Sequence, residues 1–257
     1  AQGLTLQAGK KMEAIELDFT ADERRLGGFV APDADGQKDG SKTSNWKAGL
    51  GWQDANGLKI RASAARSDVD TRYNNYLSFT DWSRNPYLNQ GISKQKYVQD
   101  NLGFAVTIPL DTTRQISLQH QNSKRFSGLT PWYDPTSPTE YDYKQTTNEV
   151  VLSDRISNWS WRLGGLLNQA ERSNKLGVVH KDTDAVFAQT HVRLDSVTWM
   201  LGARQERVSY SYAQPGNSSL SSAHNLPQWE TGFNKSLSEI SSIYATYSKS
   251  FLAPDVD

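Results

Sequence analysis

The chain has 257 residues with 28 basic and 28 acidic side chains, so its formal net charge is zero and nothing in its composition indicates a nucleic-acid partner. It contains no cysteine, which excludes disulfides, thiolate metal sites and a cysteine nucleophile. Hydrophobic residues make up 36% of the chain, and no run approaches the roughly 18 consecutive apolar residues of a membrane-spanning helix.

Apolar residues recur instead at every second position, which is the period of a β-strand. Between Asn101 and Leu110, for example, every second residue from Leu102 onward is apolar. The same alternation is present in the segments 45–53, 58–66, 114–122, 158–168 and 196–206. We count roughly eleven such strands between Met12 and Lys249.

Short and long connections alternate between these predicted strands. The short ones are Asp54–Gly57, Leu110–Arg114, Asp154–Asn158, Arg193–Ser196 and Ser236–Glu239. The long ones are Ala21–Ser44, Ser67–Lys96, Lys124–Tyr143, the shorter Glu171–Thr183, and Tyr210–Pro227. In a meander this order places all short turns at one end and all long loops at the other, which is typical of outer-membrane β-barrels.

The two faces of the predicted strands differ in polarity. One carries Trp, Leu, Ile, Phe, Val and Ala, and the other carries Lys, Arg, Gln, Asn, Ser and Glu. Burying the polar face in a dry core would cost about 1–3 kcal/mol for each unpaired group, so we expect lipid outside and a wet interior. Four tryptophans stand one to three residues past a connection, where an aromatic girdle is expected: Trp46, Trp159, Trp199 and Trp229.

The predicted fold class is therefore all-β, an antiparallel up-and-down transmembrane β-barrel. An odd number of strands leaves two open edges, and open edges do not occur in the hydrocarbon region of a membrane. The N-terminal segment shows no charged stretch followed by an apolar run, so no signal peptide is expected. Because the odd strand count leaves two edges open, we interpret the chain as part of a larger barrel.

The C-terminal segment Ser238–Pro254 resembles a strand of TonB-dependent outer-membrane transporters that ends in Phe-x-Ala-Pro. The matching positions are Tyr244, Ala245, Tyr247, Ser248, Phe251, Ala253 and Pro254, whereas Leu252 replaces the usual arginine. The segments Trp199–Tyr212 and Leu226–Glu239 resemble the two strands that precede it in that family. The likeness is clearest over Thr198–Asp257.

The resemblance implies a barrel of about 22 strands that is closed by an N-terminal plug domain, with the Phe-x-Ala-Pro strand near its middle. Residues 1–257 would then form one partial barrel domain of about half the strands, without the plug and the C-terminal strands. The implied location is the outer membrane. The implied partners are membrane lipid and lipopolysaccharide, the plug domain, and the TonB energy-coupling protein.

The function implied by the resemblance is energy-dependent uptake of a large, scarce solute such as a ferric siderophore, haem or cobalamin. A passive porin or an adhesion barrel would share the strand alternation and the segregated loops, and remains an alternative. A soluble extracellular β-protein is a third. No cofactor is expected.

Aromatic and basic residues gather in the long connections. Such residues hold large anionic or aromatic guests by stacking and cation–π contacts, so these are candidate ligand-binding residues. Alternatively, the aromatic rings pack the loops against each other and the arginines contact lipopolysaccharide phosphates. The candidates are Arg72, Tyr73, Tyr76, Trp82, Arg84, Tyr87, Arg125, Phe126, Trp132 and Tyr133.

The sequence offers little support for an enzyme or a metal site. The four histidines, His120, His180, His191 and His224, lie in no recognisable catalytic motif, so we expect no enzymatic activity. Asp33, Asp35 and Asp39 share one glycine-rich loop, but Ser44 stands where a calcium loop requires glutamate. We interpret that segment as a loop tip without metal.

Overall fold

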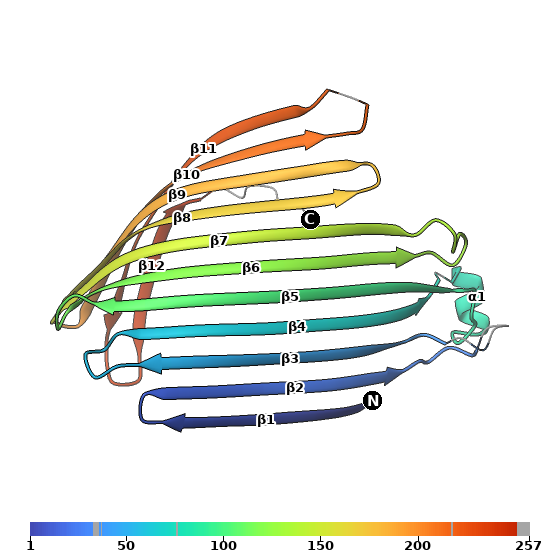
Figure 1. Ribbon diagram of the computed structural model, residues 1–257, viewed down its shortest axis with the longest axis horizontal. Helices are drawn as coiled ribbons and strands as arrows, with labels where there is room; N and C mark the ends of the chain where they lie inside the picture. Colours follow the sequence, from blue (N-terminus) through green and yellow to red (C-terminus); the bar gives the residue numbers. More distant parts are fainter. Residues whose placement is uncertain (33–35, 37, 76, 217, 251–257) are drawn as a thin grey trace.

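The computed structural model describes residues 1–32, 36, 38–75, 77–216 and 218–250. Its twelve strands form one antiparallel sheet in which each strand pairs with the next in sequence (Figure 1). The strands are β1 Gln2–Met12, β2 Ile15–Gly27, β3 Gly40–Gln53, β4 Lys59–Asn74, β5 Ile92–Pro109, β6 Arg114–Thr130, β7 Thr139–Ile156, β8 Trp159–Asn174, β9 Gly177–Leu194, β10 Val197–Ala213, β11 Leu220–Ser236 and β12 Ser242–Lys249. The single-sheet, all-β prediction is confirmed.

Eleven of these strands, β2–β12, lie in the predicted range between Met12 and Lys249, whereas β1 precedes that range and was not predicted. The two-residue connection between β1 and β2 is Glu13–Ala14, and neither residue is a typical turn former. Glu13 nevertheless adopts φ 35°, as Ser157 and Asp195 adopt φ 44° and 50° in two other tight turns. Two-residue hairpins favour this left-handed backbone because it matches the twist of the flanking strands.

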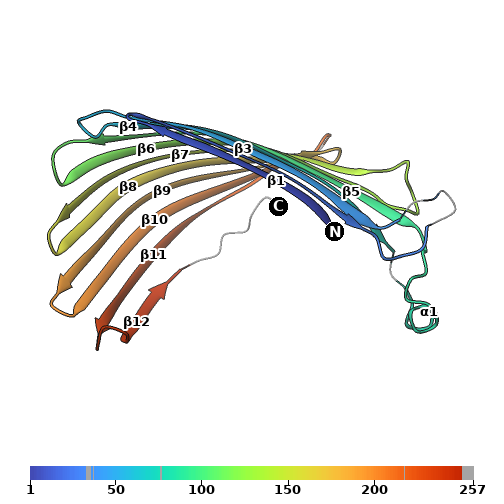
Figure 2. The same cartoon turned by 90° about the horizontal axis from the view of Figure 1, so that it is seen from below.

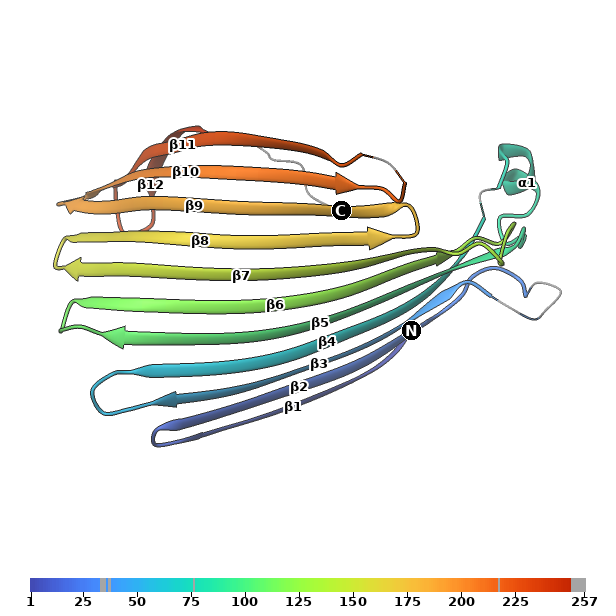
Figure 3. The same cartoon turned by 45° about the horizontal axis from the view of Figure 1, so that its top comes forward.

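Connections are segregated by end, as predicted, except that the two-residue connection 175–176 lies at the end of the long ones; the strands also reach further than expected. One end carries the short turns at 13–14, 54–58, 110–113, 157–158, 195–196 and 237–241. The other end carries the connections 28–39, 75–91, 131–138, 175–176 and 214–219. The segment 75–91 contains the short helix α1, Phe79–Arg84, which begins after the N-cap Ser78 (Figure 3). The expected loop Glu171–Thr183 is almost entirely strand.

The sheet is strongly curved, with α1 near the end of its concave side (Figure 2). Its apolar face is the exposed, convex one: Leu102, Leu163 and Leu201 are 60%, 53% and 56% exposed. On the opposite face of β10, Gly202 and Val208 are buried and Arg204 is half-buried. The predicted separation of an apolar and a polar face is therefore confirmed.

The apolar band on the convex face runs obliquely across the strands. On β5 it extends up to Leu102, which pairs with Asn122 on β6. On β10 its last apolar residue is Ala203, which pairs with Ala188, and Ala188 pairs with Leu163. The band thus drops toward the short turns from β5 to β10, as expected for strands tilted against a membrane plane.

The predicted aromatic girdle is partly confirmed. Trp159 and Trp199 are the first and third residues of their strands and lie on the convex face beside the short turns. Trp46 and Trp229 share that face, but they lie well inside β3 and β11 rather than next to a connection. Within the described residues β1 and β12 are the two edges of the sheet, which is open. No helix in the described part of the chain is long and apolar enough to span a membrane.

Candidate ligand-binding vestibule

Tyrosine, arginine and lysine side chains gather on the concave face of β5–β10, near the long-loop end. The strand register brings them together: Arg125 pairs with Tyr143, Tyr143 with Arg172, and Lys181 with Tyr210. All of them are half-buried in the curve of the sheet. We refer to this set as the aromatic–cationic cluster, and it consists of Tyr97, Arg125, Tyr141, Tyr143, Arg172, Lys181, Tyr210 and Tyr212.

Cations lie over ring faces within this cluster. The guanidinium carbon of Arg125 is 3.7 Å from the Tyr143 centroid, and that of Arg172 is 5.6 Å from the Tyr141 centroid. Lys181 Nζ is 5.8 Å from the ring centre of Tyr210. These are cation–π distances. Positive charge is therefore held beside flat apolar surface, an arrangement that suits a guest both anionic and planar.

Between the cluster and the short turns, the concave face is lined by polar side chains, and we refer to this surface as the polar wall. Gln99 donates to the side chains of Asn101 and Ser123, at 3.1 and 3.3 Å. On β7 and β8, Asn168 Oδ1 accepts from Gln145 and from Thr147, at 2.9 and 2.8 Å. Apart from the exposed Gln145, these amide and hydroxyl side chains are half-buried yet hydrogen-bonded, as a wet or protein-filled interior requires.

An ion pair extends this wall on β10. Arg204 contacts Glu206 at 2.7 Å, and the neighbouring Glu230 accepts from Gln189 at 3.2 Å. Arg162 lies 5.6 Å from the Phe187 ring on the same face. The concave face is thus polar and charged along most of the length of the strands.

Three long connections pack against one another at the rim. Ala31 N–H donates to the Tyr87 carbonyl at 3.0 Å, and Asn89 donates to the Ala31 carbonyl at 2.9 Å. Trp132 rests on Gly91, where a Cβ atom would lie 2.6 Å from the indole ring. For Trp132 the structure thus shows the ring packing that was the alternative to ligand binding, whereas Tyr87 contacts the neighbouring connection through its backbone carbonyl and its side chain is 59% exposed.

The predicted site residues fall into separate environments. Arg125 belongs to the aromatic–cationic cluster, whereas the adjacent Phe126 points to the convex face, in register with Val98. Arg72 is also on the convex face, 3.9 Å from Asp70, and Tyr73 is on the concave face. These four were expected in loops but lie in β4 and β6, because the strands continue past the apolar band.

The remaining candidates lie in the connections. Trp82 and Arg84 are in α1, where Trp82 stacks on Phe79 with 6.4 Å between centroids. Tyr133 is 74% exposed and meets Trp132 edge-on at 6.1 Å. Tyr76 lies outside the described residues. The structure therefore does not bring the predicted set together as one site.

Most of the cluster was missed by the sequence analysis. Tyr141 and Tyr143 fall at the end of the predicted connection Lys124–Tyr143, and Arg172 and Lys181 fall in the predicted connection Glu171–Thr183. The available signal was the spacing of two residues between Tyr141 and Tyr143 and between Tyr210 and Tyr212, which places each pair on one strand face. Their convergence on one patch follows only from the register.

Four of the matching residues of the family-like segment lie in the described part of the chain: Tyr244, Ala245, Tyr247 and Ser248. Tyr244 pairs with Asn234 and Tyr247 with Thr231, so they occupy opposite faces of β12. Tyr247 packs against Trp229 on the convex face, 5.2 Å between centroids. Phe251, Ala253 and Pro254 lie outside the described residues.

Acidic groups in the connections serve local structure. Asp39 Oδ1 accepts from Val30 N–H at 2.9 Å, while Asp33 and Asp35 are outside the described residues. The hydroxyls of Thr136 and Ser137 donate to Asp134 and lower its pKa. The described residues contain no group of three or more His, Asp or Glu side chains arranged to hold a metal ion. Two of the histidines have polar neighbours: His120 bonds Asn148 at 2.8 Å, and His180 lies 3.6 Å from Glu171.

Comparison with solved structures identifies the fold. The ferric citrate transporter FecA in its unliganded form is 9% identical with a TM-score of 0.82, over 96% of this chain and 40% of that one. The copper transporter OprC is 14% identical with a TM-score of 0.76, over 99% of this chain and 43% of that one. The ferric-catecholate import receptor Fiu from E. coli K12, open form, is 10% identical with a TM-score of 0.74, over 98% of this chain and 53% of that one.

The open sheet of this chain thus has the fold of part of these transporters and receptors, and the chain spans between 40% and 53% of their lengths. No protein-family model and no curated protein matches the sequence. The resemblance read from residues 198–257 agrees with the solved structures at the level of the fold.

Proposed function

We propose that the chain is the barrel portion of a TonB-dependent outer-membrane transporter that takes up a large, scarce solute of the ferric siderophore, haem or cobalamin class. The observation that supports this most strongly is the combination of fold and polarity: a sequential antiparallel sheet of transporter type whose convex face is apolar and whose concave face is polar. A barrel in lipid needs this combination, since its outer face meets acyl chains and its inner face meets water or protein.

The aromatic–cationic cluster is the proposed capture surface. It stands at the end that carries the long connections, which faces the cell exterior in barrels of this kind. Arg125, Arg172 and Lys181 supply positive charge for an anionic solute, and the tyrosine rings supply stacking surface. The ferric, copper and catecholate cargoes named for the matched structures belong to those proteins; for this chain we propose the class alone.

The polar concave wall is the proposed contact surface for a plug domain. Its half-buried amides and the Arg204–Glu206 pair offer many hydrogen-bonding groups to a protein partner. Coupling to TonB belongs to the same proposal and depends on the family resemblance. Release of solute would then require movement of the plug, because a closed barrel wall does not itself open.

The test is uptake by cells that carry the complete protein. A Gram-negative host lacking its own receptors is supplied with a panel of ferric chelates, haem and cobalamin under limiting conditions. Growth on one solute, abolished when TonB is deleted, is the expected result. Uptake that is independent of TonB would point instead to a passive porin, and absence of uptake with retained cell adhesion would point to an adhesion barrel.

A further inference from the structure

The turn between β3 and β4 contains the one asparagine of the chain that is followed by glycine, Asn56–Gly57. Asparagine is a chemically labile residue, and Asn56 is exposed. Its side-chain amide is attacked most readily by the next main-chain nitrogen when glycine supplies it, because no Cβ hinders the approach. Gly57 has φ +88°, a conformation that glycine adopts without strain. The turn therefore favours the very residue that makes Asn56 reactive.

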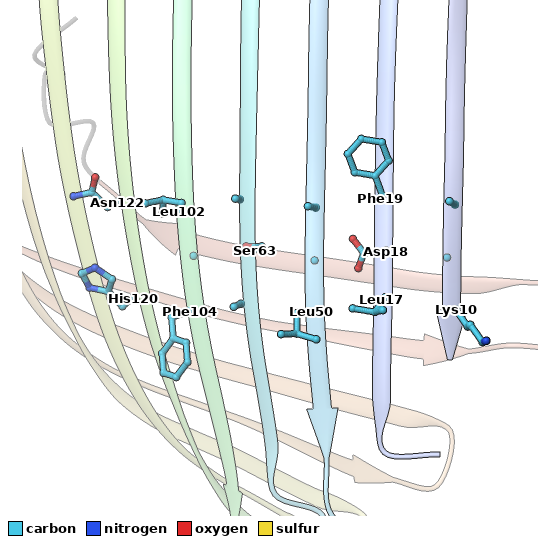
Figure 4. Close-up of a pocket in the computed structure, with 17 residues that line it drawn as sticks. Lys10, Leu17, Asp18, Phe19, Leu50, Ser63, Leu102, Phe104, His120 and Asn122 are labelled. Atoms are coloured by element: carbon cyan, nitrogen blue, oxygen red, sulfur yellow. The ribbon is translucent and has the colours of Figure 1, made fainter. Parts of the chain in front are cut away.

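Three hydrogen bonds close this turn, and one of them involves the reacting nitrogen. Gly57 N–H donates to the Asp54 carbonyl at 3.2 Å, and Leu58 N–H donates to Asp54 Oδ1 at 2.7 Å. Asp54 N–H donates to the Leu58 carbonyl at 3.0 Å. Figure 4 shows the two strands that lead into the turn side by side, with Leu50 on β3 and Ser63 on β4. While the turn is closed the Gly57 N–H is occupied, so the folded hairpin protects the neighbouring asparagine.

We propose that Asn56 is a deamidation site whose reaction is controlled by opening of this turn. When the turn opens, the Gly57 nitrogen bonds to Asn56 Cγ and the Cγ–Nδ2 bond breaks. The proton of the Gly57 N–H leaves with the amide nitrogen as ammonia. The resulting succinimide takes up one water molecule, which opens the ring at either of its carbonyls. The products are aspartate and isoaspartate, with no change of oxidation state and with a negative charge that asparagine lacks.

The reaction prevents the turn from closing as before. In the succinimide the Gly57 nitrogen carries no hydrogen, so its bond to the Asp54 carbonyl is lost. In isoaspartate the main chain runs through Cγ and is longer by a methylene group, which moves Gly57 away from Asp54. The hydrogen bonds between Asp54 and Leu58 depend on the same spacing. Deamidation therefore makes a transient opening at this end of the sheet permanent. The inference is independent of the proposed function, because it needs neither a solute nor a plug.

The test follows residue 56 of the complete protein by mass spectrometry of its peptides. The protein is incubated folded in detergent and unfolded in guanidinium chloride, at the same pH and temperature. The succinimide and the two acids should form at least about tenfold more slowly in the folded sample, because the attack requires the open turn. Equal rates in the two samples overturn the proposal.

Asp54→Ala tests the part played by the turn. It removes the carboxylate that accepts from Leu58 N–H, so deamidation of the folded protein should become at least about threefold faster, the effect of one hydrogen bond on a local opening. Asp134→Ala is the matched control, because the Asp134 carbonyl likewise accepts from the N–H three residues on, that of Ser137, at 3.3 Å. This turn lies at the other end of the sheet, so the control should leave the rate within about twofold. A rate in Asp54→Ala no faster than in the control overturns the proposal.

Asn56→Gln separates the chemistry from the fold. Glutamine closes the larger ring slowly, so no acid should appear at this position. The amides of Asp54 and Leu58 should then keep their protection against hydrogen exchange on storage, whereas in the stored unsubstituted protein they should exchange faster. Equal loss of protection in both proteins would show that deamidation does not open the turn. Should Asp54→Ala fail to fold, the comparison of folded and unfolded protein decides alone.

Discussion

Arg125 lies over the ring of Tyr143 on the adjacent strand, with 3.7 Å between the guanidinium carbon and the ring centroid. The next residue on the chain, Phe126, points to the opposite face of the sheet. A single peptide step thus separates a residue of the proposed capture surface from one on the outer wall. This relationship provides a matched pair of substitutions.

We predict that Arg125→Ala weakens solute binding about tenfold, because it removes a positive charge and a cation–π contact from the cluster. Phe126→Ala should leave solute affinity within about twofold, since its side chain faces away. Quenching of intrinsic fluorescence by the solute identified in the uptake panel provides the measurement. Equal losses in the two variants would indicate a general folding defect and contradict the assignment of the concave face.

Leu118 and Gln119 test the orientation of the sheet in lipid. Leu118 is exposed on the convex apolar face and Gln119 is on the concave face, where its register partner is Glu149. Leu118→Arg should destabilise the inserted barrel by about 2–4 kcal/mol, because the charge faces acyl chains. Gln119→Arg should be close to neutral beside a carboxylate. Unfolding in urea from lipid vesicles measures both, and similar costs would mean that the two faces are not lipid and lumen.

Gly91 positions the loop tryptophan. Its φ is +111°, and a Cβ atom there would lie 2.6 Å from Trp132. Gly91→Ala should therefore displace the indole ring and loosen the packed rim, at a cost of about 1–3 kcal/mol. Gly216→Ala is the control, because its φ is also positive, +78°, and nothing lies within 4 Å of the new methyl group.

Limited proteolysis of the intact protein in detergent reads out that effect. Cleavage in 75–91 or 131–138 should become faster for Gly91→Ala than for Gly216→Ala. If both variants are cut at the wild-type rate in those segments, Trp132 does not hold the rim together.

The hydrogen bonds to Asp111 predict that the stability of the turn 110–113 depends on pH. The backbone N–H groups of Thr113 and Arg114 donate to its carboxylate, as does the Arg114 side chain, and they hold its pKa well below the ordinary value of 3.8. A lowered pKa means that the charged form is the one the folded turn favours. The stabilisation is therefore complete above about pH 4 and is lost as the pH falls through the lowered folded-state pKa.

Carboxyl carbon NMR of the refolded protein checks this directly. The Asp111 resonance should titrate with a midpoint below 3.8. In Thr113→Pro the first of these N–H donors is absent, and the midpoint should move upward. A midpoint at or above the ordinary value in the unchanged protein would contradict the hydrogen-bonded turn.

Some of the molecule was predictable because its signal is local. Alternation from Leu102 to Ile108 fixes one face of β5, and the turn residues of Asp54–Gly57 fix a hairpin, since both follow from backbone geometry within a few residues. The order of short and long connections then predicted which end of the sheet carries the long loops. The turn at Glu13–Ala14 carries no such signal, so β1 was not recognised.

The ends of the strands and the composition of the vestibule were decided only by tertiary structure. Past the apolar band the regular alternation of apolar and polar residues is lost, so Lys124 to Thr130 resembles a loop although hydrogen bonding to β5 and β7 keeps it extended. Arg125, Tyr143 and Arg172 are far apart in sequence and meet because two successive registers, β6–β7 and β7–β8, align them. Alternation along one strand determines on which face of the sheet a side chain lies. Its neighbours on adjacent strands depend on the strand register, and the register is set by pairing across the whole sheet.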